Sequence, residues 1–434
     1  MLSETRRLPH LLSHLIDSNG HTTARLDGFT LSSHFQPIYS LSHARVVGHE
    51  ALLRACDANG RPTAPPDVFA ACRNAMELAL LDSLSRVVHM RNFVRQQPQS
   101  QWLFLNIHPA VFQRLAMRPD GGTRYLSEVS AALGLPGEGM VLEVLETDAS
   151  DLPAMEAAMA TARRHGCLIA IDDFGAGHSN FDRVWRLQPD IVKLDRSLVA
   201  RAAKDRRTQR VVSQMVSLLH ECGAMVLMEG VETVDEALVA MEADADMVQG
   251  YHFGRPQPLL VPNGHSPTAI TGLYEGLGQR RTARRAAYRD LMAPYQQAIA
   301  AAALHLQQGA TTEAACSGFL GLPGAEMAYL LDGDGYQIGQ DEWPHAPTAQ
   351  PHPGYEPLSQ GEGACWARRP YFRRATEAVG TVQTTRPYRT LHGNHSCVTV
   401  SCAFLQDTAH GPQLRVVCGD IVWDEAALAR GGVA

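Results

Sequence analysis

One stretch near the middle of the chain constrains the fold more than any other. It starts with the short apolar run Leu168–Ile171, which is followed directly by Asp172 and Asp173, a glycine-bearing loop and a segment of helical period. A second apolar run, Ile191–Leu194, carries Lys193 inside it. This order of strand, acidic tip, helix and strand predicts one βαβ unit, whose two strands run parallel.

The lysine in this unit indicates a site. A lysine inside a buried strand loses its hydration, which is unfavourable unless its ammonium group meets an anion. Because Asp172 and Asp173 follow the first strand of the same unit, we expect these acids and Lys193 to converge.

Strands and helices alternate on both sides of this unit. Alternation over roughly 250 residues is typical of a parallel sheet or a (β/α)8 barrel, and a count of about eight strands favours the α/β barrel. The predicted strands are Phe35–Tyr39, Val46–Leu53, Gln101–Ile107, Met140–Leu145, Leu168–Ile171, Ile191–Leu194, Met225–Met228 and Met247–Gln249. The predicted helices include Ala75–Phe93, Thr123–Leu133, Pro153–His165, Thr208–Cys222 and Thr233–Glu242.

Beyond Pro256 the alternation stops. A polar, arginine-rich stretch follows, and Pro294 fits the start of a helix with an apolar stripe. The pattern then turns to β, with a hairpin predicted around the DGDG turn at 332–335. We therefore predict an N-terminal arm (1–29), a barrel (30–258), a helical linker (259–308) and an α+β domain (309–434). We interpret the arm as a short helix or loose segment rather than a signal peptide.

Composition excludes some classes of protein. With 45% hydrophobic and 19% charged residues among 434, the chain is typical of a globular protein with two or three domains. A formal net charge of −7 argues against DNA as a partner, because counterion release needs a positive face. No apolar run reaches the length of a membrane span. Nine cysteines without paired spacing favour a reducing, cytoplasmic location.

Polar residues gather at the ends of the predicted strands. In a barrel all of them would lie at one rim, where active sites of that fold are built. Two carboxylates about 4 Å apart repel by roughly 4 kcal/mol at an effective dielectric of 20, more than one lysine can offset. Oxygen ligands without histidine or cysteine suit Mg²⁺ or Mn²⁺ rather than zinc, and a two-metal site serves displacement at phosphorus. The residues are Glu50, Asn106, Glu143, Asp172, Asp173, Lys193, Glu229 and Gln249.

Other interpretations of these residues exist. A single carboxylate at a strand end is more often a helix cap or a solvated group. An enolase-type barrel also combines Mg²⁺ carboxylates with a lysine base, but that chemistry does not explain Asn106 or a second metal.

These positions carry a family resemblance. The motifs are Glu50-Ala-Leu-Leu-Arg54, Asn106 after an apolar strand, Glu143-Val-Leu-Glu146, Asp172-Asp173-Phe174-Gly175, Lys193-Leu-Asp195, Glu229-Gly-Val-Glu232 and Gln249-Gly250-Tyr251. In this order the chain resembles the EAL phosphodiesterases, which hydrolyse cyclic di-GMP, over roughly residues 30–256. The resemblance implies a modified TIM barrel whose first strand runs antiparallel.

The resemblance also implies a role for each residue. The implied ligands of two Mg²⁺ or Mn²⁺ ions are Glu50, Asn106, Glu143, Asp172, Asp173 and Glu229. Glu229 resembles a possible general base, Lys193 the residue that orients the water, and Glu232 a supporting residue. Glu146 resembles the acid that holds the loop Phe174–Asn180, which couples dimerisation to metal occupancy. The implied substrate contacts are Gln36, Arg54 and Gln249.

The sequence departs from the family pattern near this loop. Leu145 stands where threonine is common, and residues 174–180 read FGAGHSN where FGTGYSS is usual. The loss of hydroxyl groups there bears on the stability of the loop and on the basal rate rather than on the metals.

We therefore expect a cytoplasmic homodimer that converts cyclic di-GMP to linear pGpG. The alternative is a non-catalytic cyclic di-GMP receptor. That interpretation would require some of the metal-ligating residues to be missing from the sequence. No synthase-type GGDEF stretch accompanies the barrel, so we expect degradation only.

The C-terminal domain resembles the Cache and PAS-like sensor class more loosely. That resemblance implies a small-ligand pocket, for which Trp366, Arg369, Tyr371 and Arg386 are candidates, since aromatic rings supply faces and arginine an anion partner. A dimerisation or purely structural domain is the alternative.

Overall fold

The computed structural model describes residues 7–108, 111–112, 123–145, 152–177, 181–262, 268–344, 361–390, 395–409 and 411–423. Two structural units divide the chain, the first from Met1 to Gly278 and the second from Gln279 to Ala434. No helix among the described residues combines the length and the apolar character needed to cross a membrane.

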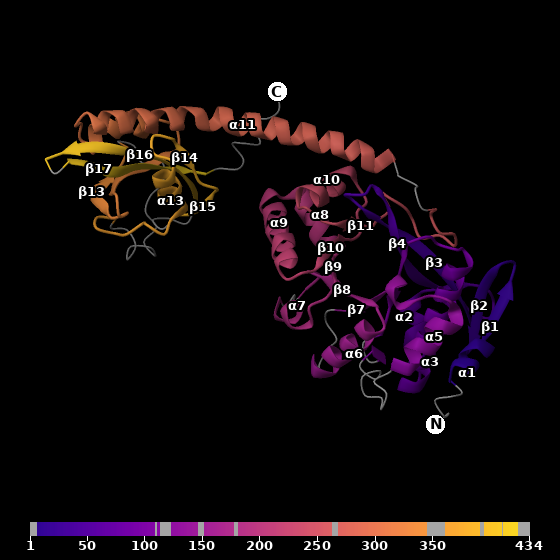
Figure 1. Ribbon diagram of the computed structural model, residues 1–434. Coiled ribbons are helices and arrows are strands. Elements are labelled where there is room, and N and C mark those ends of the chain that lie inside the picture. The colour runs from indigo at the N-terminus through magenta and orange to yellow at the C-terminus, as the bar shows by residue number, and fades with distance from the viewer. Residues whose placement is uncertain are drawn as a thin grey trace. The chain divides into compact units, whose positions relative to one another are not determined.

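The first unit is a closed barrel of eight strands, which confirms the predicted fold class (Figure 1). The strands are β3 (Phe29–Ser40), β4 (Arg45–Cys56), β6 (Trp102–Asn106), β7 (Met140–Leu145), β8 (Leu168–Phe174), β9 (Ile191–Leu194), β10 (Met225–Met228) and β11 (Met247–Val248). β3 pairs antiparallel with both β4 and β11, whereas the remaining neighbours pair parallel. This is the reversed first strand that the family resemblance implied.

Helices cover the outside of the barrel. They are α2 (Pro65–Ala70), α3 (Ala75–Arg95), α5 (Thr123–Leu133), α6 (Leu152–Arg164), α7 (Phe181–Leu187), α8 (Arg196–Lys204), α9 (Arg206–Glu221) and α10 (Val234–Glu242), with a 3-10 turn at Gly137–Gly139. The sequence patterns did not predict α8, which is short and begins at an aspartate cap: the Asp195 side chain accepts from the Ser197 N–H.

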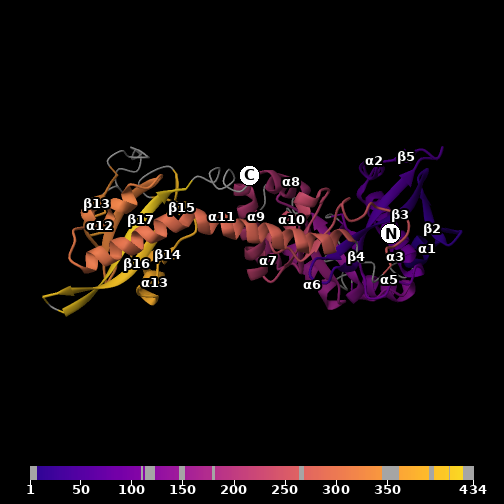
Figure 2. The same cartoon turned by 90° about the horizontal axis from the view of Figure 1, so that it is seen from above.

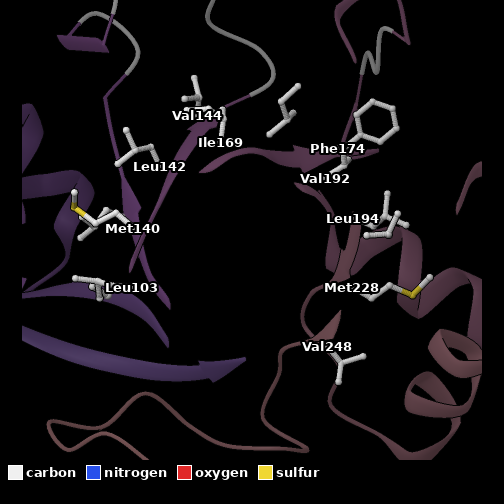
Figure 3. Packing of buried hydrophobic residues seen from close by; sticks show 14 of the residues in the cluster. Leu103, Met140, Leu142, Val144, Ile169, Phe174, Val192, Leu194, Met228 and Val248 are labelled. Atoms are coloured by element: carbon white, nitrogen blue, oxygen red, sulfur yellow. The ribbon is translucent and has the colours of Figure 1, made fainter. Parts of the chain in front are cut away.

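The barrel has an outer and an inner apolar layer. Side chains of Leu142, Ile169, Val192 and Met228 lie on the outer side of the strands, toward the helices, with the other labelled residues of Figure 3. The alternate positions fill the interior, with Ile38, Phe104, Val141, Ala170, Ile191, Leu227 and Met247 in one cluster. Because side chains alternate along a strand, both layers come from the same strands. Because apolar side chains fill the interior, the polar residues at the strand ends lie at the rim of the barrel.

The segment before residue 30 contains strands in addition to the expected short helix. Helix α1 (Arg7–Ser13) fits the expected short helix, but β1 (Leu15–Ser18) and β2 (His21–Leu26) extend the sheet antiparallel from β3, and β5 (Pro62–Thr63) pairs with β4. The Asn92 side chain on α3 holds this segment by hydrogen bonds to the backbone of β2. Its amide donates to the Thr22 carbonyl and accepts from the Thr22 N–H, both at 2.7 Å, so buried backbone groups of β2 are satisfied.

The second unit is an antiparallel sheet with helices (Figure 2). Its strands are β12 (Ala325–Asp332), β13 (Gln337–Glu342), β14 (Gln383–Thr384), β15 (Tyr388–Arg389), β16 (Ser396–Thr408) and β17 (Gly411–Val422). They pair in the order β13-β12-β17-β16-β14, with β15 also on β16. Helices α12 (Thr312–Leu320) and α13 (Pro370–Glu377) complete the unit, and β12 with β13 forms the hairpin predicted at the DGDG turn.

The predicted helix start at Pro294 is wrong. Pro294 lies inside the helix α11, which runs from Thr268 to Gln307, within the stretch assigned to a helical linker. Met292, Tyr295 and Ile299 of this helix form one cluster with side chains of β16 and β17. Because this packing stabilises the helix on both sides of the proline, the loss of one backbone N–H does not end it.

Gly250, which follows β11, offers a test of the fold. A Cβ atom there would lie 2.1 Å from the carbonyl oxygen of Val231, which is backbone and cannot move aside. We expect Gly250→Ala to lower the free energy of unfolding by about 2–3 kcal/mol. Gly272→Ala is the control, since Gly272 is an exposed helical residue with nothing within 4 Å, and should be neutral or stabilise by about 1 kcal/mol. Urea denaturation measures both, and equal midpoints would contradict the packing.

Candidate active site

The polar residues predicted for the rim do meet there. Glu50, Asn106 and Glu143 lie on β4, β6 and β7, and Asp172 with Asp173 lies on β8. Lys193 lies on β9, while Glu229 and Gln249 directly follow β10 and β11. Parallel strands point their carboxyl ends to one side of a barrel, so residues far apart in the sequence become neighbours.

Lys193 is the centre of the site. Its ammonium nitrogen Nζ lies 2.6 Å from Glu143 Oε1, 2.7 Å from Glu229 Oε1, 3.0 Å from Asp172 Oδ1 and 3.9 Å from Glu50 Oε1. The lysine side chain is 1% exposed. One cation therefore holds four carboxylates that come from four different strands or strand ends.

Burial and charge shift the protonation of this cluster. Burial raises the pKa of Glu143 well above its usual value, although Lys193 opposes the shift. Burial likewise raises the pKa of Glu229 to about 8, again against the effect of Lys193. Burial acts to lower the pKa of Lys193, but the surrounding carboxylates together raise it, so the lysine stays charged. The rim therefore carries more acid than its one cation neutralises.

Asp172 and Asp173 are presented by an irregularity of β8. The pairing of β8 with β9 shifts register between Ile171 and Phe174, and Asp173 adopts a left-handed backbone conformation with φ at 58°. The Asp173 N–H donates to Asp172 Oδ1 at 3.0 Å. Both adjacent aspartates thereby face the rim, where regular alternation would send one of them to the other face of the strand.

A second group of contacts orients Glu50. The Asn106 amide donates to Glu50 Oε1 at 2.9 Å, and the Gln249 amide donates to Glu50 Oε2 at 2.6 Å. The same Gln249 nitrogen lies 3.2 Å from Gln36 Oε1. Gln36 and Glu50 are direct partners in the β3–β4 pairing, so the antiparallel strand brings Gln36 to the rim.

Two described residues of the predicted site, Arg54 and Glu232, do not join these contacts. Arg54 donates to the carbonyl oxygen of Leu53 and contacts none of the described rim acids. Glu232 is exposed, and its backbone N–H donates to Glu236 Oε2 at 2.7 Å. Glu146 and loop residues 178–180 lie outside the described residues.

Asp195 is a neighbour of the site to which sequence reasoning assigned no role. Its charge contributes to raising the pKa of Asp173, after burial and Asp172. The sequence signal was present in Lys193-Leu-Asp195, since residues two apart on a strand share a face. Its described hydrogen bond, however, caps α8.

The residues present fit hard divalent cations. Oxygen atoms of Asp172, Asp173 and Glu229 lie within 4.8 Å of one another, and the buried Oε2 of Glu143 has no hydrogen-bond donor among the described residues. Carboxylate and amide oxygens in this arrangement match the ligands that Mg²⁺, Mn²⁺ and Ca²⁺ take in proteins.

Replacement of Lys193 tests its neutralising role. We expect Lys193→Met to lower the free energy of unfolding of the metal-free protein by about 3–5 kcal/mol, because four carboxylates lose their cation. Saturating Mg²⁺ should restore more stability to this variant than to the unaltered protein. Thermal melting with and without Mg²⁺ measures both, and Lys204→Met, at an exposed position, is the control. An unchanged melting temperature would contradict the role.

Known proteins resemble this chain over the barrel. A family model described as EAL domain matches residues 23–256. The cyclic di-GMP phosphodiesterase RocR of Pseudomonas aeruginosa is 29% identical over 241 residues, which are 54% of this chain and 59% of RocR. The probable cyclic di-GMP phosphodiesterase PdeD of Escherichia coli is 29% identical over 232 residues, 52% of this chain and 41% of PdeD. The chain thus spans between two fifths and three fifths of these two relatives.

A solved structure shares the fold over most of the chain. The Bacillus subtilis YkuI protein, which has an EAL domain, aligns with a TM-score of 0.73 at 19% identity, covering 91% of this chain and 96% of YkuI. The match of the family model to more than half of the chain, on a closed barrel with the expected acidic rim, establishes the family. The chain belongs to the EAL domain family.

Proposed function

We propose that this protein hydrolyses cyclic di-GMP to linear pGpG with two Mg²⁺ or Mn²⁺ ions. The observation that carries the proposal is the convergence of Glu50, Glu143, Asp172 and Glu229 on Lys193 at one rim. The similarity to RocR and PdeD, whose names describe cyclic di-GMP phosphodiesterases, supports the same substrate.

The rim residues divide between holding cations and acting on substrate. Glu50, Asn106, Glu143, Asp172, Asp173 and Glu229 would hold the ions. Divalent cations bound there would lower the pKa of a water and screen the phosphodiester charge. Lys193 would hold and orient the nucleophilic water, and Glu229 would accept its proton. A carboxylate beside that water is suited to accept the proton.

Further residues would complete the substrate site. Gln36 would contact the guanine base, with Gln249 beside it as a supporting substrate contact, and Arg54 would reach a phosphate after a change of its side-chain conformation. Glu232 would support the rim, and Glu146 would hold loop 174–180. We further propose a homodimer in which the C-terminal unit tunes turnover.

A non-catalytic receptor is the second candidate, because the EAL fold by itself does not require turnover. The rim of this chain retains each carboxylate position expected for metal binding, which favours the enzyme. Tight binding of cyclic di-GMP without product in either Mg²⁺ or Mn²⁺ would favour the receptor.

Turnover of cyclic di-GMP tests the enzyme directly. We expect the full chain with Mg²⁺ or Mn²⁺ to release pGpG, and Glu50→Ala to reduce the rate by about 10²–10³-fold or more, since a ligand of the ions that would stabilise the developing charge is lost. Chromatography of the nucleotides gives the rate, and Glu221→Ala, an exposed helix residue, is the control. Absence of product from the folded, unaltered protein would reject the enzyme.

Metal binding can be measured without turnover. We expect calorimetric titration with Mn²⁺ to detect binding, and Asp172→Asn to weaken it at least about tenfold because a charged oxygen ligand is lost. Asp244→Asn is a matched control, since Asp244 is an exposed residue in a left-handed conformation that asparagine also tolerates. Equal affinities of the two variants would contradict the ligand role of Asp172.

A further inference from the structure

The direction of the Asn106 side chain bears on any cation bound at the rim. The residue is exposed at the end of β6, so packing alone does not hold its side chain. Its amide nitrogen donates to Glu50 Oε1 at 2.9 Å, which leaves the amide oxygen as the atom that a cation would bind. The place of that oxygen therefore depends on the Glu50 contact and on the backbone at the end of the strand.

Two hydrogen bonds fix the backbone directly after Asn106. The Ile107 N–H donates to the carbonyl oxygen of Glu143 at 3.0 Å, which continues the pairing of β6 with β7. The His108 N–H donates to Asp82 Oδ1, also at 3.0 Å. This second bond comes from a side chain of α3 and is not part of any strand pairing. It carries the fixed backbone two residues beyond Asn106.

Asp82 is a buried carboxylate of α3. It is 3% exposed, and its second oxygen, Oδ2, pairs with Arg86 one helical turn later. Transfer of both charges out of water is unfavourable, and apolar residues of similar volume often replace such a pair without loss of stability. An apolar pair could not, however, accept the hydrogen bond from the His108 N–H. The contact with His108 is therefore what distinguishes Asp82 from an apolar residue at this position.

The opposite end of the barrel uses the same kind of contact. Asp190 Oδ2 accepts from the Ile169 N–H at 2.8 Å, near the start of β8, and lies 3.8 Å from Arg163. Both aspartates thus satisfy a backbone N–H near the end of a barrel strand. At Asp82, but not at Asp190, the fixed backbone follows a candidate metal ligand. This comparison separates support of the fold in general from support of the rim.

We propose that Asp82 is a positioning residue of the rim. By accepting from the His108 N–H it fixes the backbone after β6, and so sets the place of the Asn106 amide oxygen beside Glu50. The inference rests on the proposed function, in which Asn106 holds a divalent cation. Asp82 acts through Asn106 and touches neither cation nor substrate.

The experiment is a calorimetric titration of the full chain with Mn²⁺. Asp82→Leu is combined with Arg86→Met, so that neither buried charge is left unpaired. We expect this double variant to bind Mn²⁺ about tenfold more weakly, as is typical when a residue that orients a metal ligand is lost. In a chain that already carries Asn106→Ala, the same double change should alter the affinity by less than about twofold, because the residue through which Asp82 acts is gone.

Asp190→Leu is the matched control, since it removes a carboxylate from a strand-end N–H at the other end of the barrel. Arg163 keeps partners there, because it also donates to the carbonyl oxygens of Leu187 and Gln188. This variant should bind Mn²⁺ within about twofold of the unaltered protein. The far-ultraviolet circular dichroism of all variants should stay unchanged.

The outcomes separate this inference from the proposed hydrolysis. An unchanged Mn²⁺ affinity of the Asp82 and Arg86 double variant would overturn the positioning role, and so would an equal loss with Asn106→Ala present or in Asp190→Leu. The expected pattern of affinities in a protein that releases no pGpG would support the positioning role while rejecting the hydrolysis. Absence of Mn²⁺ binding by the unaltered protein would overturn both.

Discussion

The ion cluster around Lys193 is the interaction on which the barrel rim depends. A carboxylate pair about 4 Å apart repels by roughly 4 kcal/mol at an effective dielectric of 20, and burial makes each charge more expensive. Five carboxylates of the described residues share this rim, and the ammonium group lies within 4 Å of an oxygen of four of them. The same surplus of negative charge that strains the metal-free site gives it affinity for divalent cations. The stability of the metal-free rim and the proposed catalysis thus depend on the same ion cluster.

The barrel supplies the rigidity that this arrangement needs. Its interior is filled by apolar residues such as Phe104 and Leu227, so the strands cannot shift relative to one another without loss of packing. The irregularity of β8 then turns two successive aspartates to the same side. The reversed strand β3 adds Gln36 beside Glu50, which gives the rim an amide pair next to its acids.

The second unit places charge differently. Asp420 and Arg369 line one cavity without pairing, so their opposite charges do not neutralise each other there. In the barrel, by contrast, the cation and the acids are in contact. The difference matters because a buried charge in contact with its partners is neutralised, whereas a buried charge without a partner is unfavourable. Helix α11 packs against the opposite cluster of this sheet through Tyr295 and Ile299.

The sequence by itself determined the alternation of strands and helices, the strand ends at which Glu50, Glu143, Asp172 and Glu229 lie, and the expectation that Lys193 needs an anion. Those features are local, because periodicity and the position of a polar residue within an apolar run can be read along the chain. Tertiary structure decided which groups touch. The four partners of Lys193, the contact between Gln36 and Gln249, and the distance of Arg54 and Glu232 from the acids depend on register and rotamer. The continuation of α11 through Pro294 was also decided there, because packing against a distant sheet outweighed the local signal to begin a helix.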